Sequence, residues 1–99
     1  MLELSKNTID KIKSLFPDCS QNQAMQLIMH ECGNNLPFCE ECDEFEMERI
    51  RFAALKLSNG NIEELRKAIK LAQQDWRDLL MAAGFGEDTQ AHKKWFEKS

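Results

Sequence analysis

The stretch from Asn61 to Gly86, NIEELRKAIKLAQQDWRDLLMAAGFG, decides the fold class of this chain. Asn61 is a preferred N-cap residue, Glu64 stands in the capping-box position, and Gly84 is a preferred C-cap. Apolar residues between these ends recur in steps of three and four, which places them on one face of a helix. They are Ile62, Leu65, Ile69, Ala72, Trp76, Leu79 and Ala83.

The continuity of this helix is open to two interpretations. No glycine or proline interrupts residues 61–83, which favours a single helix about 35 Å long at ~1.5 Å per residue. The alternative is a break near Gln74, after which Asp75 caps a second helix. The chain therefore contains five helices, or six if the break occurs.

The rest of the chain is divided into helical stretches by proline, glycine and polar turn residues. Ser20 with Gln23 forms a capping-box pattern at the start of the second stretch. The third stretch has apolar residues on two sides, which is typical of a central helix packed on both flanks. The expected helices cover residues 5–16, 20–32, 44–57, 61–83 and 89–98.

Strand patterns are missing from the sequence, which has no tyrosine, no valine and no sustained alternation of apolar and polar residues. We therefore expect an all-α fold in a single domain, residues 1–99. Its architecture is predicted to be a compact orthogonal bundle of five or six helices whose N-terminal part is three-helix-like. Residues 33–43, GNNLPFCEECD, are expected to form an irregular acidic loop, with Leu36 and Phe38 holding it to the core.

Charge is unevenly distributed along these 99 residues, which carry a net charge of −4. Residues 1–48 sum to −7 and residues 49–99 to +3. Phosphate repels an acidic chain, so nucleic acid is a disfavoured partner. The sequence has no apolar run long enough to span a membrane and no signal-peptide pattern, so we expect a cytoplasmic protein.

Four cysteines follow the spacing C-x12-C-x6-C-x2-C, at Cys19, Cys32, Cys39 and Cys42. Our first interpretation is four ordinary reduced thiols and no cofactor. The alternative is a zinc site, because a C-x2-C pair supplies two soft ligands from one turn. A redox role is disfavoured, since Glu40 and Glu41 within that pair destabilise a thiolate.

No catalytic motif occurs in the sequence, and neither His30 nor His92 stands in a catalytic signature, so we expect no enzyme activity. The C-terminal segment combines Lys93 and Lys94 with Trp95 and Phe96. Basic and aromatic side chains together can bind single-stranded nucleic acid, which is a second alternative function. The other interpretation is that Trp95 docks the last helix on the core.

A wide apolar face on the 61–83 helix can serve as core, as interface, or as both. Candidate interaction residues are Trp76, Leu80, Met81 and Trp95. The function predicted from the residues is therefore a small non-catalytic protein-interaction domain, which binds an unknown protein or a second copy of itself.

Two family resemblances accompany these patterns. Residues Arg51 to Phe85, RFAALKLSNGNIEELRKAIKLAQQDWRDLLMAAGF, resemble the signature of a family of small bacterial proteins of uncharacterised function. That resemblance implies a bacterial, cytoplasmic, all-helical protein and carries over no functional residues. Residues Ile9 to Leu36 are similar to the first two helices of ubiquitin-associated and CUE-type domains. Those domains close with a third helix, whereas Pro37 and the acidic loop follow here, so we interpret this likeness as shared three-helix geometry.

Overall fold

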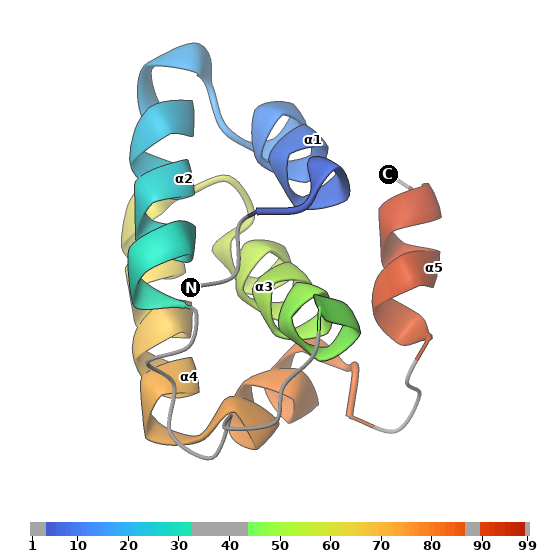
Figure 1. The fold of residues 1–99 in the computed structure, drawn as a ribbon. Helices are drawn as coiled ribbons and strands as arrows, with labels where there is room; N and C mark the ends of the chain where they lie inside the picture. The colour runs from blue at the N-terminus through green and yellow to red at the C-terminus, as the bar shows by residue number, and fades with distance from the viewer. Residues whose placement is uncertain (1–3, 33–43, 87–89, 99) are drawn as a thin grey trace.

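The computed structural model describes residues 4–32, 44–86 and 90–98, and in these ranges the chain is all-α, as predicted (Figure 1). No strand occurs in the described ranges. The helices are α1 (Lys6–Leu15), α2 (Asp18–Glu31), α3 (Glu44–Ser58), α4 (Ile62–Ala83) and α5 (Ala91–Lys98). Within that part of the chain, no helix is both long enough and apolar enough to cross a membrane. The loop predicted over residues 33–43, with Leu36 and Phe38, lies outside the described residues.

Helix α3 is the centre of the fold and contacts α1, α4 and α5, whereas α2 packs on α1 and α4. In Figure 1, α2 and the first part of α4 stand on one side of α3, and α5 stands on the other. The prediction of apolar residues on two flanks of this helix is confirmed, because Met47, Ile50, Phe52 and Leu55 are all buried. Full burial of each such side chain stabilises the fold by about 1.5–3 kcal/mol relative to exposure.

The start of α2 differs from the prediction. The helix begins at Asp18, and its N-cap is Pro17, whose carbonyl oxygen accepts hydrogen bonds from the backbone N–H groups of Ser20 and Gln21 at 2.9 and 3.1 Å. Ser20 is therefore inside the first turn, and its hydroxyl donates back to the Pro17 oxygen at 3.4 Å. The predicted capping box of Ser20 and Gln23 is wrong, because the extended backbone of Pro17 already starts the helix.

Helix α4 is broken at Asp75, so the continuous helix favoured by the sequence is wrong and the alternative is correct. Asp75 has extended backbone angles (φ −164°, ψ 109°), and its carboxylate accepts a hydrogen bond of 3.0 Å from the backbone N–H of Arg77. Figure 1 shows α4 changing direction sharply part-way along its length. The side chain of Arg77 binds the same carboxylate through two bonds of 2.9 Å. Asp75 thus acts as an N-cap for the second segment of α4.

Both predicted ends of α4 are confirmed. The Asn61 side chain accepts a hydrogen bond of 3.1 Å from the Glu64 backbone N–H. Gly84 adopts the left-handed conformation (φ 80°), and the Phe85 N–H donates a hydrogen bond of 2.8 Å to the Leu80 carbonyl oxygen. This C-terminal turn directs Phe85 back into the core, where it is 1% exposed.

Candidate functional site

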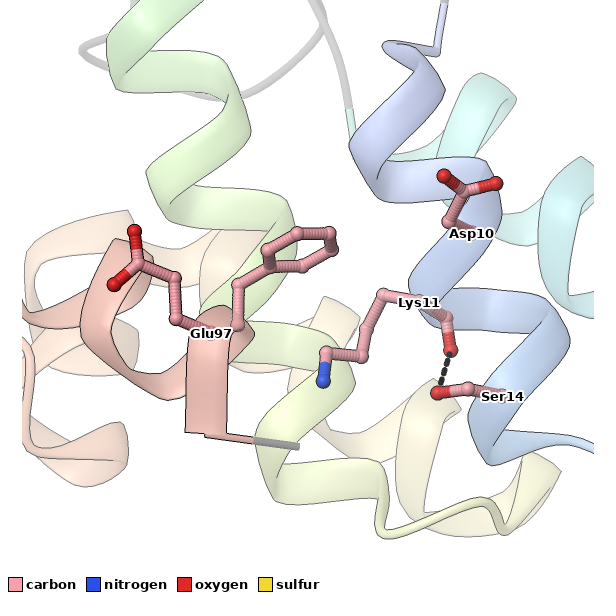
Figure 2. Close-up of a pocket in the computed structure, with 5 residues that line it drawn as sticks. Asp10, Lys11, Ser14 and Glu97 are labelled. Carbon is pink, nitrogen blue, oxygen red and sulfur yellow. Dashed lines mark hydrogen bonds between the residues drawn. The ribbon is translucent and has the colours of Figure 1, made fainter.

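A groove of about 320 Å³ lies between α1 and α5, two helices from opposite ends of the chain. Figure 2 shows that Lys11 extends from α1 towards α5, whereas the carboxylates of Asp10 and Glu97 point away from the space between the two helices. The groove is lined by Asp10, Lys11, Ser14, Phe96 and Glu97. Its volume is at the lower end of small-ligand pockets, which suits one or two side chains of a binding partner.

The residue that distinguishes this groove is Lys11. Although lysine is rarely buried, Lys11 is only 3% exposed. Its Nζ lies 4.3 Å from the ring centre of Trp95 and 5.3 Å from that of Phe96. Both are cation–π distances, and each such contact contributes about 0.5–2 kcal/mol. Burial lowers the pKa of Lys11 below its ordinary value.

The aromatic rings behind the groove come from α3 and α5. The Phe96 ring stacks on Phe52 with centres 5.5 Å apart and planes 11° apart, while Trp95 meets Phe52 edge-on at 5.7 Å. His92, fully buried, packs edge-on against Phe45 and Phe52. Each aromatic pair adds about 0.5–1.5 kcal/mol beyond area burial. These contacts fix α5 on α3 and hold Phe96 in the groove wall.

Three cations of α3 are bound to the ends of other elements. Arg51 Nε donates to the Cys32 carbonyl oxygen at 2.9 Å, at the end of α2. Lys56 Nζ donates to the Ala83 oxygen at 2.7 Å, at the end of α4, and Arg49 donates to the Phe85 oxygen at 2.6 Å. Cations are favoured at helix C-termini, where carbonyl groups lack helical partners. Three of the ten basic residues in the second half of the chain thus bind backbone carbonyl groups of the fold.

Of the four predicted zinc ligands the structure describes two, Cys19 and Cys32, and these lie apart. Cys19 lies in the first turn of α2 and Cys32 caps its other end, 13 residues further on, which is about 20 Å along a helix. Two thiolates on one zinc ion are at most ~4.6 Å apart, given Zn–S bonds of about 2.3 Å. Cys32 is fully buried, and this raises the pKa of its thiol to about 12. Cys39 and Cys42 lie outside the described residues.

The four predicted interaction residues have different environments. Leu80 is a core residue at 3% exposure, and Trp76 is half-buried against the core. Met81 is the one large hydrophobic side chain that is exposed in the described ranges, at 64%. Trp95 is half-buried beneath Lys11. The Trp95 ring contacts Lys11, which lines the α1–α5 groove, and Phe52 of α3 lies behind it.

The predicted nucleic-acid segment is α5. Lys93 and Lys94 are exposed, and Lys93 Nζ lies 5.0 Å from the ring centre of Phe45. Trp95 and Phe96, the rings expected to stack on bases, instead pack against Phe52. A base could use these rings fully only if α5 moved away from α3.

Sequence reasoning missed Lys11. The available signal was its position, since residue 11 falls on the same helical face as Thr8 and Ile12, the other buried residues of α1. Its aromatic partners, Trp95 and Phe96, lie more than 80 positions further along the chain, so no residue near Lys11 in sequence indicates this contact.

Comparison of the chain with protein-family models, curated proteins and solved structures gives no match.

Proposed function

We propose that this protein is a non-catalytic protein-interaction domain whose contact site is the groove between α1 and α5. The observation that supports the proposal is the pairing of an aromatic wall, Phe96, with a charged rim formed by the exposed Asp10 and Glu97. An apolar centre surrounded by polar groups is the usual organisation of a protein–protein contact. The rigid mounting of Phe96 on Phe52 reduces the entropy lost when a partner binds.

The bound partner is expected to be a short segment of another protein rather than a broad surface. The groove holds one or two side chains, and the described surface has Met81 as its one exposed large hydrophobic residue. A contact centred on one groove suits a transient complex with a small interface.

Selection from a random peptide library displayed on phage tests this proposal with the full chain as bait. The matched baits are Ser14→Trp, which fills the groove from α1, and Gln23→Trp, which adds the same ring to an exposed position on α2. We expect enriched peptides that bind the wild type and Gln23→Trp equally and bind Ser14→Trp about tenfold more weakly or less. The proposal fails if no peptide is enriched, or if enriched peptides bind all three baits equally while thermal melts show all three folded.

A further inference from the structure

The ammonium group of Lys11 lies at the groove, and no anionic partner for it occurs among the described residues. Among residues 4–32, 44–86 and 90–98, no oxygen atom accepts a hydrogen bond from its Nζ, whose neighbours are the faces of Trp95 and Phe96. Figure 2 shows the side chain extending from α1 towards α5, into the space between the two helices. An ammonium group that lies beside aromatic rings and has no acceptor among the described residues keeps its capacity for three strong hydrogen bonds to a ligand.

Two of the residues that line the groove with Lys11 carry the opposite charge. Asp10 precedes it on α1, and Glu97 is on α5 across the groove, and both carboxylates are exposed. These two rim charges repel a polyanion such as a phosphate cluster, whereas they attract basic groups on either side of a single carboxylate. The residues that line the groove thus place one cation between the helices and two outward-facing carboxylates, one on each helix.

We infer that the groove binds a peptide segment in which one acidic side chain, flanked by basic residues, pairs with Lys11 while an apolar side chain lies on Phe96. This inference rests on the proposed function and specifies the chemistry of the partner. A charge-assisted hydrogen bond to Nζ supplies an acceptor that the described residues do not provide, and the basic residues pair with Asp10 and Glu97. The net charge of −4 on the whole chain favours such a basic segment at long range.

The test is an NMR titration of the full chain with the peptide acetyl-Lys-Leu-Glu-Leu-Lys-amide, and with the same peptide carrying Gln in place of Glu. The readout is the indole N–H signal of Trp95, with that of Trp76 as an internal reference. We expect the Glu peptide to shift the Trp95 signal and to bind about tenfold more tightly than the Gln peptide.

Two variants assign this preference to Lys11. Lys11→Met keeps the apolar stem and removes the charge, so it is expected to bind both peptides equally weakly. Lys11→Arg keeps a cation over the rings and is expected to retain the preference for Glu. Lys13→Met, at an exposed position of the same helix, is the matched control and is expected to behave as the wild type.

Several results overturn the inference. If both peptides bind the wild type equally, or if Lys11→Met keeps the preference for Glu, the carboxylate does not pair with Lys11, although the proposed function stands. If neither peptide binds while phage selection yields peptides sensitive to Ser14→Trp, the groove is an interaction site for a different chemistry. If neither peptide binds and selection also fails, the proposed function fails with the inference.

Discussion

Arg51 Nε donates a hydrogen bond of 2.9 Å to the carbonyl oxygen of Cys32, the C-cap residue of α2. Both residues are buried, Arg51 at 2% exposure and Cys32 at 0%. Burial lowers the pKa of the guanidinium. The carbonyl oxygen at the C-terminus of a helix is a favoured site for a cation. This contact connects the centre of the fold to the point where α2 ends.

Replacing Arg51 with Met is therefore expected to destabilise the protein by about 2–3 kcal/mol, because the Cys32 carbonyl oxygen loses a buried, charge-assisted hydrogen bond. Urea unfolding followed by circular dichroism measures the change. Arg66→Met, at an exposed position of α4, is the matched control and should fall within about 0.5 kcal/mol of the wild type. Equal stability of the two variants would show that the Arg51 contact contributes nothing.

Because its thiol is buried, Cys32 is expected to make the folded protein less stable at alkaline pH. Burial raises the pKa of its thiol from 9.0 to about 12, and the nearby Arg51 charge opposes part of the rise. Below pH 9 the thiol is protonated in both the folded and unfolded chains and adds no pH dependence. Between pH 9 and 12 only the unfolded chain ionises, so the free energy of unfolding falls by up to about 1.4 kcal/mol per pH unit.

The comparison that isolates this effect is wild type against Cys32→Ala, by urea unfolding at pH 8, 9, 10 and 10.5. Lys11 has a lowered pKa, so it contributes a rise in stability over the alkaline range, but it contributes equally to both proteins. The stability difference between wild type and Cys32→Ala should therefore shrink as the pH rises. A difference that stays constant from pH 8 to 10.5 would contradict a buried, protonated thiol.

Cys19 and Cys32 lie at opposite ends of α2, so a single zinc ion is expected not to bind both thiols. Because one ion cannot contact both ends of this helix, any zinc that the purified chain carries is expected not to depend on both thiols. Native mass spectrometry of protein prepared without chelator measures the metal content of the wild type, Cys19→Ser and Cys32→Ala. Loss of one zinc per chain in each of the two variants would mean that α2 unwinds to form the site.

Local sequence signals predicted the fold where the deciding interaction was also local. Asn61 and Gly84 satisfy backbone groups within one turn, so their roles could be predicted from neighbouring residues. The start of α2 was mispredicted because two signals competed, and the Pro17 carbonyl took the role assigned to Ser20. The break at Asp75 had a local signal, yet propensity alone favoured a continuous helix.

The candidate site was less predictable because long-range contacts form it. Position 11 could be assigned to the inner face of α1, but the choice of Trp95 and Phe96 as partners depends on how α5 packs on α3. Similarly, the sequence showed a basic second half, whereas the use of Arg51 and Lys56 at helix ends depends on tertiary structure.

Two glycines with nearly the same backbone conformation provide the last prediction. Gly60 (φ 81°) follows α3 and Gly84 (φ 80°) follows α4, so alanine at either position incurs about 1 kcal/mol of left-handed strain. The surroundings differ, since a Cβ at Gly60 would overlap the backbone carbonyl oxygen of Leu15, whereas at Gly84 the nearest atom is Lys56 Nζ at 3.6 Å. A backbone oxygen at the end of α1 cannot move without shifting the helix, while a lysine side chain can.

Gly60→Ala is therefore expected to destabilise the protein by at least about 1 kcal/mol more than Gly84→Ala. The loss of stability in Gly84→Ala should come from left-handed backbone strain alone. Urea unfolding of the two variants beside the wild type measures the difference directly. Since both variants share the same backbone conformation and the same added methyl group, their difference reports the approach of the α3–α4 turn to the end of α1. Equal losses in the two variants would mean that the turn does not rest on Leu15 in solution.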